Sequence, residues 1–207
     1  MSSVVAEVPS QDVQSTPMRA RRKLCLLRKA AMEKSIAKRK MKRRKITVVS
    51  KPARFPSYDD KGDHVAIYVG TGQHARNLPL LKELGIRAVL NCAPSVVKDP
   101  KVKYSRDSIA YAELDCNDVK GFPILKYLPK ASKFIRNNHN KGNNVLVHCM
   151  SGVNRSATLV VAYILTRDKP PFLKLVEDCL ERRPSILSNV DFQLKLCHLA
   201  HQHKLLR

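Results

Sequence analysis

The order of apolar and polar residues predicts strands and helices that alternate along the chain from about residue 63 onward. Residues 64–69 alternate apolar with polar side chains and stop at Gly70, which is typical of a half-buried strand. Leucines with helical spacing follow in residues 78–84, and Gly85 ends their shared face. Two further short apolar runs indicate strands at residues 86–90 and 109–114.

The second half of the chain continues this alternation and contains its most apolar segments. Pro123 begins a predicted helix that reaches Asn137. Residues 145–147 (Val-Leu-Val) are wholly apolar, as expected of a strand buried on both sides. Strands that alternate with helices indicate an α/β domain with a central, largely parallel sheet flanked by helices. Three more helices are predicted, at residues 157–166, at 170–183, and from Ser188 or Asn189 to residue 203.

The first 62 residues have a different composition and lack this pattern. Residues 1–17 are rich in Ser, Val, Gln and Pro, and we expect them to be disordered. Residues 18–45 hold 14 Lys or Arg and one acid, Glu33. Their composition favours a helix, but like charges repel and apolar residues are sparse, so we expect a fluctuating helix that orders on a partner. Residues 46–62 contain Pro52, Pro56 and Gly62 and are predicted to be a linker.

The distribution of charge supports a division into a basic N-terminal extension, residues 1–60, and a folded domain, residues 61–207. The net charge is +22 at pH 7. The extension holds 16 Lys or Arg against 5 acids, and the domain holds 23 against 12. The same excess is therefore concentrated in far fewer residues of the extension. Such a field attracts anions such as nucleic acid, acidic protein surfaces, anionic lipid or phosphorylated substrates.

Short basic motifs in residues 19–48 suggest kinds of partner. Residues 38–45 fit a nuclear localisation signal or a nucleic-acid patch, which favours the nucleus, with the cytoplasm as the alternative. Residues 21–26 and 43–48 resemble basic-then-apolar docking peptides that bind mitogen-activated protein kinases. We therefore expect kinase docking or nucleic-acid contact through this segment.

The six cysteines are scattered, without the CxxC pairs of a zinc site or a disulfide framework. They are predicted to be reduced thiols of an intracellular protein. No apolar run approaches the ~20 residues that span a bilayer, and the first residues lack a secretory pattern. His198, His201 and His203 are predicted to belong to a solvated helix end, so no metal or other cofactor is expected.

Residues 148–156, His-Cys-Met-Ser-Gly-Val-Asn-Arg-Ser, lie between a predicted buried strand and a predicted helix. The start of a helix presents unpaired N–H groups and a positive dipole end, which suits an anion. Gly152 permits a turn that aims successive amides inward, and Arg155 offers a planar fork for phosphate oxygens. These groups should favour the thiolate of Cys149 and lower its pKa. An anion cradle that holds a thiolate predicts phosphoryl transfer to sulfur, followed by hydrolysis.

This loop resembles the signature of the cysteine-dependent protein phosphatases, His-Cys-x-x-Gly-x-x-Arg-Ser. Its flanking strand and helix are similar to those of the dual-specificity branch, and the resemblance covers about residues 63–203. It implies a cysteine-phosphatase fold in which Cys149 is the nucleophile. The phosphate-binding residues that it implies are Met150, Ser151, Gly152, Val153, Asn154 and Arg155.

Cleavage of a phosphate ester also requires a proton for the leaving oxygen. Three acids precede the loop, Glu113, Asp115 and Asp118, and periodicity does not separate them. Residues 117–128 resemble the general-acid loop of the family, which implies Asp118 as the acid and leaves Asp115 as the second candidate.

Three further residues near the nucleophile have roles to weigh. The resemblance implies that Ser156 stabilises the leaving thiolate when the phosphocysteine breaks down, and that His148 orders the loop and tunes the thiolate. Cys116 could form a disulfide with Cys149, but an ordinary thiol is the favoured interpretation.

The leading functional hypothesis is a dual-specificity protein phosphatase that acts on phosphotyrosine and phosphoserine or phosphothreonine. Phosphoinositide phosphatases of the superfamily usually carry lysines inside the loop. Here the variable positions, Met150, Ser151, Val153 and Asn154, are not basic, which favours phosphoproteins as substrates. An RNA 5′-phosphatase is one alternative, because of the positive charge. A scaffold that binds through the basic extension is another, although the retained Cys149 and Arg155 count against it.

Overall fold

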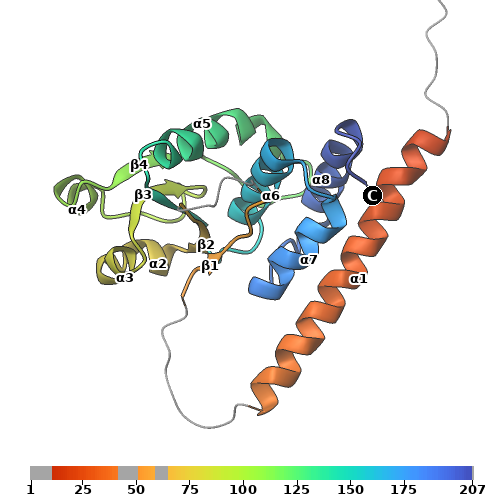
Figure 1. Cartoon of the computed structure of the whole chain (residues 1–207), viewed down its shortest axis with the longest axis horizontal. Coiled ribbons are helices and arrows are strands. Elements are labelled where there is room, and N and C mark those ends of the chain that lie inside the picture. The colour runs from red at the N-terminus through yellow and green to blue at the C-terminus, as the bar shows by residue number, and fades with distance from the viewer. Residues whose placement is uncertain (1–10, 42–50, 59–64, 207) are drawn as a thin grey trace, which may run out of the picture.

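The computed structural model describes residues 11–41, 51–58 and 65–206, with the backbone alone described at residues 11–15 and 39–41. Its centre is a five-stranded sheet with the order β1-β2-β5-β3-β4 (Figure 1). Strand β1 pairs antiparallel with β2, and the other pairs are parallel. The prediction of a mostly parallel sheet is therefore confirmed. The strands are β1 (Ala53–Arg54), β2 (Ile67–Thr71), β3 (Ile86–Asn91), β4 (Ala110–Glu113) and β5 (Asn144–Cys149).

Helices cover both faces of this sheet. On one face, Val145 and Val147 of the central strand β5 belong to a large apolar cluster with α5, α6, α7 and α8. On the other face, Leu146 packs in a smaller cluster with α2, α3 and α4. This two-sided burial explains why residues 145–147 are all apolar. The helices are α1 (Gln11–Met41), α2 (Gly72–Arg76), α3 (Leu78–Glu83), α4 (Lys101–Arg106), α5 (Leu128–His139), α6 (Arg155–Asp168), α7 (Phe172–Arg182) and α8 (Val190–Gln202), with a short 3₁₀ helix η1 (Ile124–Tyr127) before α5.

Several boundaries differ from the predictions for physical reasons. The helix predicted from Pro123 begins as η1 and becomes α5 only at Leu128, where Pro129 occupies the first turn. Helix α2 begins directly after β2, because Thr71 caps it through a capping box with His74. The periodicity of the sequence did not predict α2 or α4, which are too short to produce a repeat. Among the described residues, no helix has the length and apolar character needed to cross a membrane.

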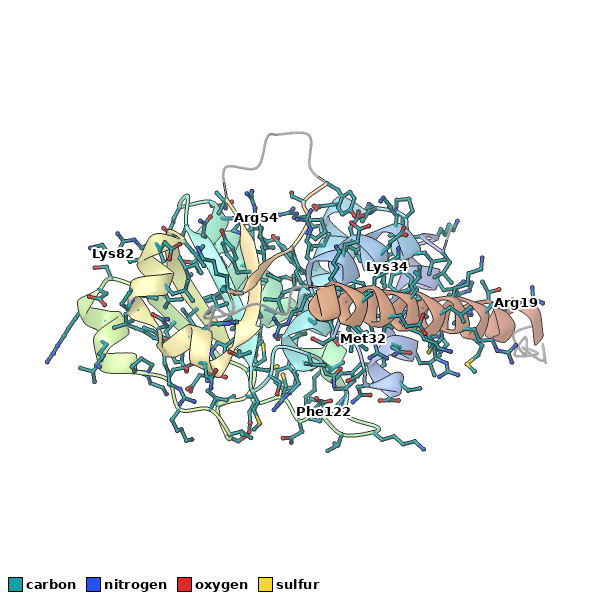
Figure 2. The ribbon with its side chains drawn as sticks, turned by 90° about the horizontal axis from the view of Figure 1, so that it is seen from below. Arg19, Met32, Lys34, Arg54, Lys82 and Phe122 are labelled. Carbon is teal, nitrogen blue, oxygen red and sulfur yellow. The ribbon has the colours of Figure 1, made fainter. Side chains whose placement is uncertain are left out.

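The N-terminal segment departs most from expectation. Helix α1 begins at Gln11, so the prediction of disorder through residue 17 is wrong from that point on. The helix lies along α7 and α8 of the same chain (Figures 1 and 2). Ordering by a partner stays a prediction. Ala20 and Leu24 are buried and Leu27 and Ala31 are partly buried, which gives α1 a narrow apolar face.

The predicted linker is also partly structured. Residues 53–54 form β1, and Phe55 is buried in the large cluster and donates a backbone hydrogen bond to Ile67. The linker interpretation is therefore wrong for this stretch. Residues 42–50 and 59–64 lie outside the described residues. They include His64 and the second half of the basic run at 38–45. The division at residue 60 remains a prediction.

Candidate active site

Cys149 is the last residue of β5, and Arg155 is the first residue of α6. We name the intervening residues 150–154 the β5–α6 loop. Strand β5 pairs with β2 and β3, so the loop leaves the sheet at the carboxyl ends of parallel strands. Ligands bind at this edge in open α/β sheets, because the loops there surround a crevice. The predicted strand–loop–helix arrangement around Cys149 is thus confirmed.

Donors from outside the β5–α6 loop bind its carbonyl oxygens. Arg183 donates from its Nε to Gly152 O at 2.7 Å and from a terminal nitrogen to Ser151 O at 2.8 Å. The N–H of Leu187 donates to Val153 O at 2.8 Å, and Gly72 N lies 3.2 Å from Met150 O. With the carbonyls held outward, the amides of the loop are free to face the nucleophile. The N–H groups of Gly152 and Ser156 do face it, since both hydrogen-bond its sulfur. Inward-facing backbone N–H groups of this kind can form an anion-binding concavity.

Gly152 is required at its position for two reasons. Its φ of +63° lies in the left-handed region that favours glycine. A Cβ at this residue would lie 2.4 Å from Gly70 O on the neighbouring strand. Any side chain would therefore push the β5–α6 loop away from β2.

Cys149 is only 2% exposed, and its thiol is tuned by several contacts. Burial alone would raise its pKa. Hydrogen bonds from the hydroxyl and N–H of Ser156, the positive charge of Arg155 and the N–H of Gly152 outweigh burial, and the pKa is lowered. The Ser156 hydroxyl lies 3.4 Å from the sulfur. A nucleophilic thiolate is therefore favoured at this position.

The guanidinium of Arg155 is buried beside the nucleophile. Its Nη1 donates to the backbone carbonyl of Cys116 at 3.3 Å, which anchors the side chain at one end. Its Nε has no hydrogen-bond partner among the described residues. The side chain thus keeps donor capacity for an anion in the β5–α6 loop.

His148 interacts with an acid that the sequence did not reveal. Its Nε2 lies 2.8 Å from Asp99 Oδ2, and both side chains are fully buried. Its Nδ1 lies 3.2 Å from the carbonyl oxygen of Cys149. Asp99 also accepts a hydrogen bond from the hydroxyl of Tyr111 at 3.2 Å. The pair fixes the ring of His148 beneath the nucleophile, consistent with an ordering role for this histidine.

Asp118 is brought to the β5–α6 loop by two side-chain amides. Asn154 donates to its Oδ2 at 2.9 Å, and Asn189 donates to its Oδ1 at 2.9 Å. The residue remains exposed.

Asp115 is also exposed, and its backbone carbonyl accepts a hydrogen bond from Tyr127 at 2.8 Å. Glu113 pairs with Lys101, which lowers its pKa, and so belongs to a separate ion pair.

Cys92 and Cys116 are buried near the nucleophile, and burial favours their protonated form. Burial raises the pKa of Cys116 to about 12 and raises that of Cys92 well above its usual range. All six described cysteines are free thiols. The carboxylates and thiols of the described residues form no group of three or more with histidine that could hold a metal ion.

Sequence reasoning missed three side chains that shape this site: Asp99, Arg183 and Asn189. Each comes from a segment far along the chain, and Asp99 is 49 residues from its partner His148. Asn189 was considered only as a helix cap, a role that it does perform for α8. No spacing rule connects these residues to the nucleophile.

The comparisons with known sequences all indicate the same family. A family profile described as "Dual specificity phosphatase, catalytic domain" matches residues 67–202. Dual specificity protein phosphatase 6 of Homo sapiens is 31% identical over 101 residues, which are 49% of this chain and 26% of that protein. Dual specificity protein phosphatase 2 of Mus musculus is 30% identical over 152 residues, 72% of this chain and 46% of that protein. The matched parts thus span less than half of either relative.

Solved structures share the fold. The Yvh1 phosphatase domain from Chaetomium thermophilum superposes with a TM-score of 0.59 at 24% identity, covering 73% of this chain and 96% of that domain. Human DUSP28 gives a TM-score of 0.56 at 20% identity, covering 67% of this chain and 94% of that protein. The predicted cysteine-phosphatase fold is therefore confirmed.

Proposed function

The chain belongs to the dual-specificity phosphatase family, and we propose that its domain hydrolyses phosphotyrosine and phosphoserine or phosphothreonine on proteins. The observation that carries this proposal is the surroundings of Cys149. A thiolate favoured by Ser156 and Arg155 lies at the foot of a loop whose carbonyls are bound from outside. Such a site can both hold a phosphoryl group and attack it.

In the first step, the thiolate of Cys149 attacks the phosphorus atom of the substrate. The Arg155 guanidinium and the amides of the β5–α6 loop bind the non-bridging oxygens. An S–P bond forms while the bond from phosphorus to the side-chain oxygen breaks. Asp118 donates its proton to that oxygen, and the dephosphorylated side chain leaves as a neutral alcohol or phenol.

In the second step, water attacks the phosphocysteine. The carboxylate of Asp118 now accepts a proton from the water, the new O–P bond forms and the S–P bond breaks. The Ser156 hydroxyl, 3.4 Å from the sulfur, stabilises the departing thiolate. Inorganic phosphate leaves and the starting protonation states are restored. His148, held by Asp99, is a positioning residue in this scheme.

The preference for protein substrates rests on the side chains of the β5–α6 loop. Met150, Ser151, Val153 and Asn154 carry no positive charge, so a heavily phosphorylated lipid headgroup would find no additional cations within the loop. A single phosphoryl group on a side chain needs only the amides and Arg155.

The test is phosphate release from peptides that carry phosphotyrosine, phosphoserine or phosphothreonine, with 5′-triphosphate RNA as a parallel substrate and a chelator present. We expect release from the peptides and complete loss of turnover in Cys149→Ser, which should still bind substrate. Faster release from the RNA would replace this proposal with an RNA 5′-phosphatase. The excess of positive charge in residues 1–60 is the observation that motivates this comparison.

We also propose that the basic extension directs the protein to the nucleus and contacts acidic partners. Residues 38–45 support nuclear import, although residues 42–45 of this run lie outside the described residues. Kinase docking through residues 21–26 would require α1 to move, because Leu24 is fully buried. Loss of nuclear signal from a fluorescent fusion when residues 38–45 are replaced by alanine would support the import proposal, and unchanged distribution would refute it.

A further inference from the structure

Helix α1 contacts the same segment that holds the β5–α6 loop. This segment, residues 183–189, connects α7 to α8 and supplies the donors from Arg183 and Leu187 described above. On its other side, Arg28 of α1 donates from its Nε to the carbonyl of Ile186 at 2.8 Å. The connection is thus held between α1 and the loop.

A second contact reaches the connection through a buried glutamine. The thiol of Cys25 donates to Gln193 Oε1 at 3.2 Å, and Gln193 Nε2 donates to the carbonyl of Leu187 at 2.7 Å. Gln193 is fully buried. A continuous series of hydrogen bonds therefore runs from α1 through Gln193 and Leu187 to Val153 of the β5–α6 loop.

Leu187 has a backbone conformation that needs such support. Its φ of +57° lies in the left-handed region, which is unfavourable for a residue with a branched side chain. Conformations of this kind persist only where the surroundings fix them. Here its N–H binds Val153 and its carbonyl binds Gln193, so both of its polar backbone groups are engaged.

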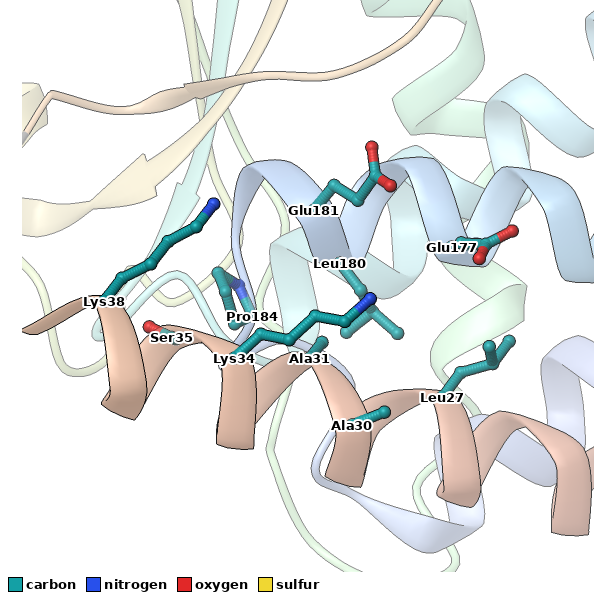
Figure 3. Close-up of a pocket in the computed structure, with 10 residues that line it drawn as sticks. All are labelled: Leu27, Ala30, Ala31, Lys34, Ser35, Lys38, Glu177, Leu180, Glu181 and Pro184. Atoms are coloured by element: carbon teal, nitrogen blue, oxygen red, sulfur yellow. The ribbon is translucent and has the colours of Figure 1, made fainter.

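Buried side chains anchor α1 near these contacts. Ala20 and Leu24 are buried immediately before Cys25 and Arg28. Farther along, α1 and α7 border a cavity of about 650 Å³, where Lys34 and Lys38 of α1 lie across from Glu177 and Glu181 of α7 (Figure 3). Buried apolar side chains therefore anchor the first part of the contact, and the second part borders a charged groove.

We propose that α1, which lies outside the family match of residues 67–202, is a positioning element for the nucleophile's loop, acting through Arg28 and Cys25 on the α7–α8 connection. This inference rests on the proposed function of that loop. If Arg28 is lost, the carbonyl of Ile186 loses its partner and Leu187 can relax toward a commoner conformation. The carbonyl of Val153 is then less firmly held outward, and the loop amides align less well with the sulfur.

The experiment compares Arg28→Ala with Lys29→Ala in the full-length chain. Lys29 is exposed and adjacent, so the control removes the same charge from the same turn of α1. The pH dependence of alkylation of Cys149 by iodoacetamide is followed by mass spectrometry of the peptide that contains it, and kcat is measured on an aryl phosphate. For Arg28→Ala we expect the alkylation midpoint to move to higher pH and kcat to fall about five- to tenfold, since a charged hydrogen bond is lost. Lys29→Ala should match the wild type.

Three additional variants keep the proposal open to refutation. Arg28→Lys retains a cationic donor and should recover part of both readouts. Cys25→Ala is a smaller deletion that should shift the midpoint in the same direction, and Cys25→Ser should restore it. The proposal is overturned if Arg28→Ala and Cys25→Ala, folded as judged by near-ultraviolet circular dichroism, alkylate with the midpoint of Lys29→Ala. The alkylation readout does not depend on turnover, so failure of the proposed function is detected separately as an inactive wild type.

Discussion

Two carboxylates lie at the two ends of the β5–α6 loop, and their environments are opposite. The side chain of Asp99 is fully buried, where it contacts His148 and Tyr111. Asp118 is exposed, where the amides of Asn154 and Asn189 orient it. The same functional group thus serves as a fixed structural partner at one end and as an accessible acid at the other. Burial and the choice of partner, rather than residue type, decide which role each can take.

The comparison has a physical basis in desolvation. Asp99 is bound through its Oδ2, which contacts both His148 and Tyr111, while its Oδ1 has no partner among the described residues. Removal of a buried partner such as Asp99 leaves another buried polar group unsatisfied. An exposed carboxylate can exchange its proton with a substrate or with water. We therefore expect substitution of Asp118 to affect catalysis and substitution of Asp99 to affect stability first.

The largest effect is expected from Asp118→Asn. General acid catalysis contributes about 10²–10⁴-fold, so kcat on a phosphoserine peptide should fall by about this factor. The fall should be smaller on an aryl phosphate with a good leaving group, which needs less protonation. Steady-state kinetics on the two substrates measure the difference. Asp115→Asn is the matched control and should retain most activity; an equal loss there would transfer the acid role to Asp115.

Asp99→Ala should have the opposite effect to Asp118→Asn, because it should affect stability first. The free energy of unfolding should fall by about 1–3 kcal/mol, because the buried ring of His148 loses its partner. Urea denaturation measures this, with Asp118→Asn expected to stay within about 0.5 kcal/mol of the wild type as a surface change. If Asp118→Asn destabilised the protein as much as Asp99→Ala, the contrast between the two carboxylates would not hold.

Ser156→Ala tests how the pKa of Cys149, which lies between the two acids, is lowered. Loss of its hydroxyl removes a hydrogen bond that lowers the pKa of Cys149, so that pKa should rise toward its ordinary value. Because the thiolate is the nucleophile, alkylation is lost as pH falls through this pKa, and in the variant that loss should begin at higher pH. The pH profile of iodoacetamide inactivation reports the shift. An unchanged profile would mean that the backbone amides and Arg155 suffice.

The smallest effect is expected from Asn189→Ser. Serine retains an oxygen that can cap α8 but lacks the amide that donates to Asp118. We expect kcat to fall a few-fold with stability nearly unchanged. Asn189→Ala is the companion variant, which should also lose about 1 kcal/mol of stability because the cap is removed. Equal stability of the two variants would argue that the cap contributes little.

The sequence predicts the parts of the site that are continuous along the chain. Cys149, Gly152 and Arg155 lie within one short segment between a buried strand and a helix, so local rules are sufficient to place them together. Asp118 required a family resemblance, because spacing alone did not distinguish it from Asp115. Asp99 and Arg183 could not be predicted, since their contacts depend on how the sheet and helices pack.

Helix α1 shows a second limit on what can be predicted from the sequence. Its buried face consists of Ala20, Leu24, Leu27 and Ala31, which repeat with helical spacing. Two of the four are alanines, so the face is too narrow to stand out among the surrounding lysines and arginines. A helix was predicted there, but its docking on α7 and α8 depends on the shape of the domain and is not encoded in the local pattern.

The central claim is that Cys149 carries the phosphoryl group during turnover. The direct measurement is mass spectrometry of the protein quenched in acid while it turns over a phosphotyrosine peptide. The account predicts one phosphoryl group on the peptide that contains Cys149, more of it in Ser156→Ala, and none in Cys149→Ser. A phosphoryl group on another residue, or turnover retained by Cys149→Ser, would contradict it.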